Sequence, residues 1–365
     1  MKKILVFLFL FVSLVSSAQD NRFECDDTCS PEETGQVTYN VVSPVGFSTV
    51  EPITMAPRLN TLDGKTIAIV GEDFMYNITH PALKQLIKEN YPTAKVIMYD
   101  ELPIAGPYPA PGIVRQSTEE FRQRLIDLKV DAVIAGNGGC GICTPKETGS
   151  CIVAEKLGIP SVIVTVPGFD EEARYTARNN GVPVLRVAVY PGAFASHTEE
   201  QLVKNTREVT WPQIVKALTT PISQDEYSAT QAAQGITDDV FHGTLDEIYA
   251  CFQKMGWSDG APFCPPTYHK VKEYLDYTDH AWDETIAVLP AAFRQTTTWH
   301  VAVNACMAGC KPEYMPILIA MTKAMAGGDF RRTLQSTHAW VPYSWLNGPV
   351  ARQLGISCGQ GEINA

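Results

Sequence analysis

The sequence has no excess of basic residues and, after its first fifteen positions, no long hydrophobic run. Its 365 residues carry 29 Lys and Arg against 40 Asp and Glu, a formal net charge of −11. Nucleic acids and anionic membrane surfaces are bound through basic patches, so this balance argues against both as partners. We also identify no GxGxxG motif, P-loop, internal repeat or low-complexity segment. What remains is an ordinary globular composition, 45% hydrophobic and 19% charged, at a length that favours two domains.

The one hydrophobic run lies at the N-terminus. Lys2 and Lys3 precede the apolar residues 4–15, and small residues follow before Gln19. This order is typical of a secretory signal peptide over residues 1–18, and the run is shorter than the roughly 20 residues that a membrane-spanning helix needs. We therefore expect an exported protein, periplasmic or secreted, in an oxidising compartment.

The middle of the chain alternates short apolar strands with helices. The pattern predicts an α/β fold, a doubly wound and mostly parallel sheet, over residues 58–220. Ligands of such sheets bind beyond the carboxyl ends of the strands. The flanking segments are predicted as an irregular leader over 19–57, a linker over 221–243 and a second, smaller helix-rich α+β domain over 244–365.

The chemistry of the first domain centres on Cys140-Gly141-Ile142-Cys143, which follows an expected strand and a glycine-rich turn. Thr144 is predicted as the N-cap of the next helix. The free N–H groups and the positive dipole end at a helix N-terminus favour thiolates, the reactive form of cysteine. A CxxC pair in this context is more typical of redox chemistry than of a structural disulfide, although export leaves the structural alternative open.

The stretch from Asp131 to Cys151 resembles the UGSC family of selenoproteins and their cysteine homologues, in which a selenocysteine-Gly-Ser-Cys motif follows a strand. Cys140 stands at the selenocysteine position, and Gly141 and Cys143 match the motif. Ile142 replaces the serine, and Gly139 replaces a usual aspartate. The likeness extends from about residue 64 to about residue 220.

These features predict a thiol-dependent oxidoreductase with Cys140 as nucleophile and Cys143 as resolving cysteine. The supporting residues are expected to be Gly141, Asn137, Glu72, Asp73 and Thr144. Glu72 and Asp73 follow the first strand and are either an acid/base partner of Cys140 or turn carboxylates. The expected partners are a small-molecule substrate or a thiol electron donor, with no cofactor. The alternatives are a protein that binds a metal or organometal through thiolates, and a structural disulfide-bonded protein without chemistry.

The second domain carries its own candidates. Cys306 and Cys310 are four residues apart and would share one face of a helix, either as metal ligands or packed in the core. A metal site would need further ligands, with His300, His338, Cys264 and Cys358 as the possible donors. The residues favoured for function here are Cys310, Asn304, His338 and Asn347.

This region resembles a domain found beside UGSC-type proteins, through Gly256-Trp257-Ser258-Asp259-Gly260 and Asn347-Gly348-Pro349. That domain continues further, so it is expected to be shortened here. The strongly apolar segment 314–326 offers more hydrophobic surface than a short domain buries. We therefore expect a second polypeptide or another copy of this chain to bind through the C-terminal domain.

Overall fold

The computed structural model describes residues 36–103, 116–228, 235–290, 292–327, 344, 346 and 348–356. The expected signal peptide lies outside these residues, as do His338, Asn347 and Cys358. Within the described part, no helix combines the length and the apolar character needed to cross a membrane.

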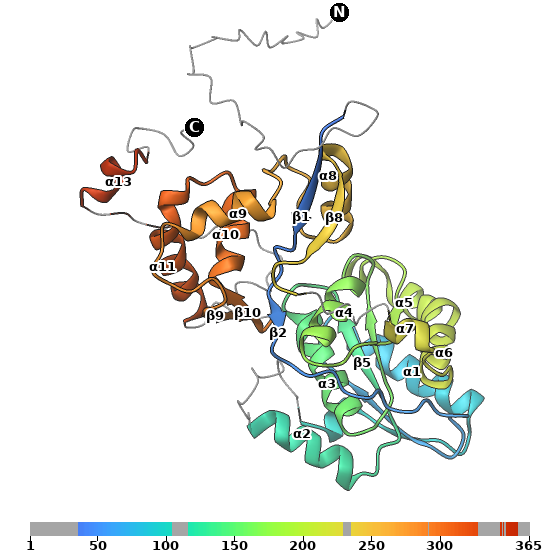
Figure 1. Cartoon of the computed structure of the whole chain (residues 1–365). Helices are drawn as coiled ribbons and strands as arrows, with labels where there is room; N and C mark the ends of the chain where they lie inside the picture. The colour runs from blue at the N-terminus through green and yellow to red at the C-terminus, as the bar shows by residue number, and fades with distance from the viewer. Residues whose placement is uncertain are drawn as a thin grey trace, which may run out of the picture.

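A five-stranded parallel sheet forms the centre of the first unit (Figure 1). The strand order is β4-β3-β5-β6-β7. Strand β4 therefore lies at one edge of the sheet, and β3, which precedes it in the chain, lies between β4 and β5. Every residue of the two central strands β5 and β6 is buried, as expected for strands covered on both faces. The predicted α/β fold is confirmed. The strands are β3 (Thr66–Val70), β4 (Lys95–Ile97), β5 (Ala132–Gly138), β6 (Ser161–Thr165) and β7 (Val187–Val189).

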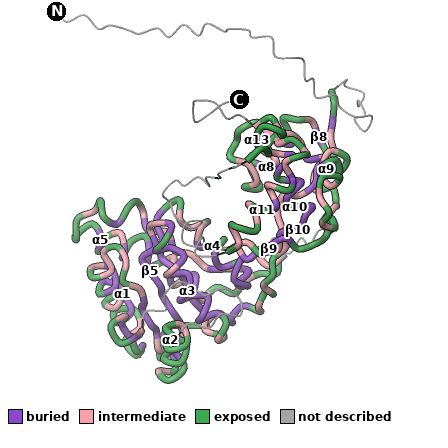
Figure 2. Tube along the Cα trace, turned by 90° about the vertical axis from the view of Figure 1, so that its left-hand side faces the viewer, coloured by how far each residue is buried: buried purple, intermediate pink, exposed green. Residues whose placement is uncertain are grey.

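Helices cover both faces of this sheet. On one face α1, α5 and α6 pack together, with Leu83 and Leu218 in their core. On the other face α2, α3 and α4 pack together around Phe121 and Ile152. Figure 2 shows the buried residues concentrated along β5 and α3. The helices are α1 (Tyr76–Asn90), α2 (Gln116–Asp127), α3 (Cys143–Lys156), α4 (Asp170–Asn179), α5 (Glu199–Asn205) and α6 (Trp211–Thr219), with a π-helical turn over Thr206–Thr210.

The second unit combines two small antiparallel sheets with helices. One sheet pairs β1 with β8, and the other has the order β2-β10-β9. The strands are β1 (Thr38–Val42), β2 (Phe47–Ser48), β8 (Asp239–Thr244), β9 (Thr285–Leu289) and β10 (Arg294–Thr297). The helices are α8 (Leu245–Lys254), α9 (Tyr268–Leu275), α10 (Thr298–Met307), α11 (Met315–Ala326) and α13 (Val350–Gln353).

The strands β1 and β8 correct two predictions, because β1 lies in the leader that was expected to be irregular and β8 begins in the expected linker. Side chains alternate across a strand, so neighbouring residues of β1 enter different cores. Val41 packs with Ile248 and Phe252, whereas Val42 packs with the core that contains Trp299. Both valines are fully buried. The second unit is thus assembled from two stretches of chain that are about 200 residues apart.

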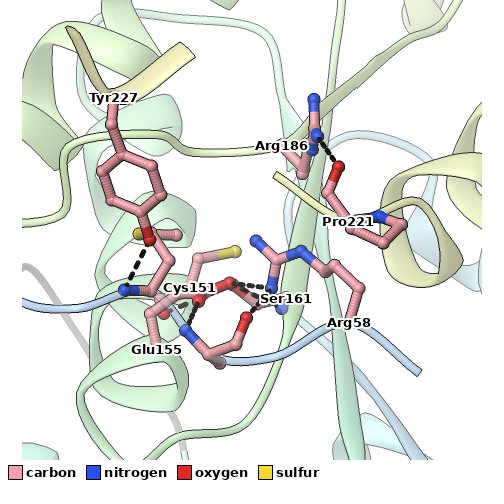
Figure 3. Close-up of polar contacts among 9 residues, drawn as sticks. Arg58, Cys151, Glu155, Ser161, Arg186, Pro221 and Tyr227 are labelled. Atoms are coloured by element: carbon pink, nitrogen blue, oxygen red, sulfur yellow. Dashed lines mark hydrogen bonds and ion pairs between the residues drawn. The ribbon is translucent and has the colours of Figure 1, made fainter. Parts of the chain in front are cut away.

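The segment between β2 and β3 crosses from the second unit to the first and is held by specific contacts. The N–H of Met55 donates to the Tyr227 hydroxyl at 3.0 Å, and the Arg58 guanidinium contacts the Glu155 carboxylate at 2.9 Å. Glu155 also accepts hydrogen bonds from the N–H and the hydroxyl of Ser161, at 2.8 and 2.9 Å. Figure 3 shows this group beside Cys151 of α3. The Arg58 and Glu155 side chains are 1% and 0% exposed, so this ion pair is fully removed from water.

Candidate functional site

The CxxC motif lies where the winding of the sheet reverses. From β3 the chain passes to β4 on one side, and from β5 it passes to β6 on the other side. Ligands of doubly wound sheets bind at this switch point, beyond the carboxyl ends of the two strands. Here those ends are the segment Gly71 to Asp73 and the segment Asn137 to Cys143. The predicted location of the site therefore agrees with the topology.

The two cysteines differ in their access to solvent. Cys140 is half-buried, whereas Cys143 is 4% exposed. Their Cα atoms are 5.4 Å apart and their sulfurs lie at bonding distance, as a disulfide. The N–H of Cys143, the first residue of α3, donates to the Cys140 sulfur at 3.0 Å. The N–H of Gly139 donates to the Cys143 sulfur at 3.5 Å. Both sulfurs thus accept hydrogen bonds from backbone N–H groups, which favours negative charge on them.

The prediction of Thr144 as the N-cap is wrong, because the N-cap is Ile142 and the helix begins two residues earlier than expected. Helix α3 begins at Cys143, and no side chain caps it. Thr144 is fully buried inside the first turn, and its N–H donates to the Cys140 carbonyl at 3.0 Å. The Cys140 carbonyl therefore satisfies one of the free N–H groups of the first turn, in the absence of a side-chain cap. Gly141 lies in the turn between Cys140 and Cys143 and is buried.

A buried carboxylate lies one helical turn after Cys143. Glu147 is 1% exposed, and its carboxylate packs against the backbone of Gly71, where a Cβ would collide with it. Burial is the main cause that raises the Glu147 pKa to about 8, against a weaker opposing effect of the Lys146 ammonium. The carboxyl is therefore a group that can gain or lose a proton near neutral pH.

The carboxylates predicted after β3 lie beside Glu147. The Lys146 ammonium contacts the Asp73 carboxylate at 2.8 Å and the Glu147 carboxylate at 3.3 Å. Glu72 lies with Glu147 and Tyr99 around a cavity of about 20 Å³, which has room for one water molecule. Asp73 is thus paired to a lysine of α3 and joins the end of β3 to the start of that helix.

Asn137 ties the CxxC turn to the start of α1. Its amide nitrogen donates to the Phe74 carbonyl at 2.7 Å and to the Thr79 hydroxyl at 2.9 Å. The neighbouring His80 is buried against the Gly71 carbonyl at 3.2 Å, and burial lowers its pKa to about 4. His80 is therefore neutral at physiological pH. From the sequence, His80 was expected to be a capping or surface residue, and its burial contradicts this. Glu147 could have been found from its spacing of four residues from Cys143.

The glycines before the motif have a packing role. The prediction that no GxGxxG motif is present is wrong, because Gly136, Gly138 and Gly141 have this spacing. A Cβ on Gly136 would lie 3.1 Å from the Val164 side chain, and one on Gly138 would lie 3.0 Å from the Thr144 hydroxyl. Close approach of β5 to β6 and α3 explains these two glycines without a bound phosphate.

Of the two alternatives for Cys306 and Cys310, the structure bears out packing in the core: Cys306 belongs to the core that contains Trp299, and Cys310 packs against it. Helix α10 ends at Met307, so Cys310 lies beyond it and does not share a helical face with Cys306. Instead the Cys306 sulfur lies 3.9 Å from that of Cys264. Asn304 donates to the carbonyls of Pro44 and His300, at 3.0 and 2.8 Å, which is a structural role. Over the described residues, no group of three or more His, Cys, Asp or Glu side chains is arranged to hold a metal ion.

The fold and this site together define a class: a doubly wound α/β protein with a cysteine pair at a helix N-terminus on the switch point of its sheet. The family follows from a direct comparison. Residues 40–220 match the model of the UGSC family, and through this part the chain belongs to that family. No curated protein matches the chain.

The raised pKa of Glu147 predicts a pH dependence of stability. The folded pKa of about 8 lies above the ordinary value of 4.5, so folding takes up a proton between these pH values. The stabilisation is complete below pH 4.5 and is lost as the pH rises through 8. Relative to Glu147→Gln, the wild type should lose about 4 kcal/mol of unfolding free energy between about pH 5 and about pH 9.

Urea unfolding at a series of pH values measures this difference. The control is Glu171→Gln, because the Glu171 side chain is 74% exposed. That variant should follow the wild type at every pH. If the free energies of unfolding of Glu147→Gln and the wild type differ by the same amount at every pH, the Glu147 pKa is not raised.

Proposed function

We propose that the protein is a thiol-dependent oxidoreductase, with Cys140 as the nucleophile and Cys143 as the resolving cysteine. The observation that carries the proposal is the unequal burial of two bonded cysteines at the first turn of α3. The accessible member is suited to attack a substrate, and the buried member is suited to attack only its neighbour.

The chemistry is a two-electron exchange between thiols and a disulfide. In the reduced protein, the Cys140 thiolate attacks one sulfur of a substrate disulfide, forms a mixed disulfide and releases the first thiolate. The Cys143 thiol then loses its proton, attacks the Cys140 sulfur and releases the second thiolate. The protein disulfide that results is reduced again by an external thiol donor. An electrophilic selenium centre would react in the same manner as the substrate sulfur.

Glu147 is the group that we assign to the Cys143 proton. Residues four apart lie on the same face of a helix, so Glu147 follows Cys143 by one turn. Its pKa of about 8 lets it accept a proton while Cys143 ionises and return the proton when the disulfide is reduced. The Lys146 ammonium stabilises the carboxylate during the step.

The setting of this chemistry is also a proposal. The N-terminal sequence supports export to the periplasm or the exterior, where the disulfide form persists. Only Met315 and Ile319 of the apolar helix α11 are buried among the described residues. This supports binding of a second polypeptide, or of another copy of the chain, through the C-terminal unit.

Alkylation of the reduced protein over a pH series tests the proposal. We expect iodoacetamide to modify Cys140 near neutral pH, before it modifies Cys310, because burial raises the pKa of the Cys310 thiol. Peptide mass spectrometry assigns each site. If iodoacetamide modifies Cys140 as slowly as it modifies Cys310, the Cys140–Cys143 disulfide is better explained as structural. Protection of Cys140 and Cys143 by an added metal ion would favour the metal-binding alternative.

A further inference from the structure

A second pair of cysteines lies in the other unit of the molecule, outside the site described above. The sulfurs of Cys264 and Cys306 are 3.9 Å apart, and both approach the carbonyl oxygen of Pro265, at 4.0 and 3.9 Å. Cys264 belongs to the loop before α9, and Cys306 belongs to α10. A disulfide requires a sulfur separation of about 2.05 Å, so closure needs a movement of roughly 2 Å.

The two thiols are unequal in the way that a reactive dithiol requires. Cys264 is partly exposed, whereas Cys306 has no exposed surface. The hydrogen bond from the Cys306 thiol lowers the pKa of Cys264, with a further contribution from the Lys270 ammonium. The same contact, together with burial, raises the pKa of Cys306. Cys264 is thus the thiolate that meets solvent, and Cys306 is the thiol held behind it.

The contacts around the pair fix the loop close to α10. The N–H of Cys264 donates to the Met307 carbonyl at 3.2 Å. The Tyr274 hydroxyl of α9 donates to the Cys310 carbonyl at 2.5 Å. These two contacts hold the loop that carries Cys264, and the helix α9 that follows it, against the end of α10. A covalent bond between the two sulfurs would join elements that already lie together.

We propose that Cys264 and Cys306 form a second reactive dithiol, which small-molecule disulfides oxidise to a disulfide that locks the loop before α9 onto α10. The Cys264 thiolate attacks one sulfur of the small disulfide, forms a mixed disulfide and releases one thiolate. The Cys306 thiol then attacks the Cys264 sulfur, and its proton passes to the second thiolate, which leaves. Two cysteines are oxidised and one small disulfide is reduced to two thiols. This modification site does not depend on the proposed function of Cys140 and Cys143.

Oxidised glutathione is the probe. The full chain carrying Cys140→Ser and Cys143→Ser is reduced, freed of reductant and treated with the probe, and its disulfides are located by non-reducing peptide mapping. We expect a Cys264–Cys306 link in this parent. We also expect Cys264 to react at least about tenfold faster than Cys310, since burial raises the pKa of the Cys310 thiol.

Two further variants separate the steps. With Cys306→Ala, the glutathione adduct should remain on Cys264, because no second thiol removes it. With Cys310→Ser, the Cys264–Cys306 link should form as in the parent. The parent keeps both Cys264 and Cys306, so its disulfide map tests the proposal even if one of these two variants fails to fold. A lasting adduct on Cys264 in the parent, a link from Cys306 to Cys310, or no reaction at Cys264 would each overturn the proposal.

Discussion

Replacing Cys140 by serine should lower the rate at which the protein catalyses reduction of a small-molecule disulfide by a dithiol donor by about a thousandfold or more. A hydroxyl is not ionised near neutral pH, so the serine that replaces Cys140 could not attack sulfur, although it fits the same space. The hydrogen bond from the Cys143 N–H, at 3.0 Å, then has no thiolate to stabilise. Steady-state rates of the wild type and of Cys140→Ser, measured with the same disulfide and the same donor, give the size of the effect.

The matched control for Cys140→Ser is Cys310→Ser. Cys310 is half-buried in the second unit, beyond the end of α10. Its loss should leave the rate unchanged if the catalysis belongs to the switch point of the sheet. A rate that falls equally in both variants, or that survives in Cys140→Ser, would assign the chemistry to another thiol.

Replacing Arg58 by methionine should destabilise the folded protein by about 3–5 kcal/mol. Methionine keeps much of the length of the side chain but leaves the buried Glu155 carboxylate without its cation. The guanidinium contacts this carboxylate at 2.9 Å, and neither side chain is exposed by more than 1% (Figure 3). Burial already raises the Glu155 pKa, so the stranded group would take up a proton and lose part of its acceptor capacity. Urea unfolding at neutral pH measures the loss.

Two variants show whether the stranded charge causes this loss. Adding Glu155→Gln to Arg58→Met removes the charge and keeps an oxygen acceptor for the Ser161 N–H and hydroxyl, so most of the stability should return. Arg207→Met removes a comparable but exposed contact, to Glu89 at 2.8 Å, and should have little effect. If the double variant is as unstable as Arg58→Met, packing rather than charge explains the result.

The sheet was predictable because its signal is local. Strands such as β3 and β6 are short apolar runs in which four or five residues are buried, and each is followed by a helix pattern. The strands β1 and β8 were missed because their pairing joins residues about 200 positions apart, such as Tyr39 and Gly243. Strand β1 has only five residues, so its alternation of buried and exposed side chains is too short to be recognised within the polar leader.

The site was predictable in part for the same reason. Cys140 and Cys143 lie within four residues of each other, so their role follows from the motif and the adjoining helix. The contact of Asp73 with Lys146 spans 73 residues and depends on β3 and β5 being neighbours. The contact of Cys264 with Cys306 spans 42 residues, so the sequence offered Cys264 only as one of several possible neighbours of Cys306. The helix start was misplaced because a backbone carbonyl can replace a threonine cap.

If Cys140 attacks and Cys143 resolves, a protein without Cys143 should trap the mixed disulfide on Cys140. Reduced Cys143→Ser is incubated with oxidised glutathione, and the modified residues are located by peptide mass spectrometry. We expect a lasting glutathione adduct on Cys140 in this variant, while the wild type forms the Cys140–Cys143 disulfide and keeps no adduct there. An unmodified Cys140 in the variant, or an equally lasting adduct in the wild type, would contradict these roles.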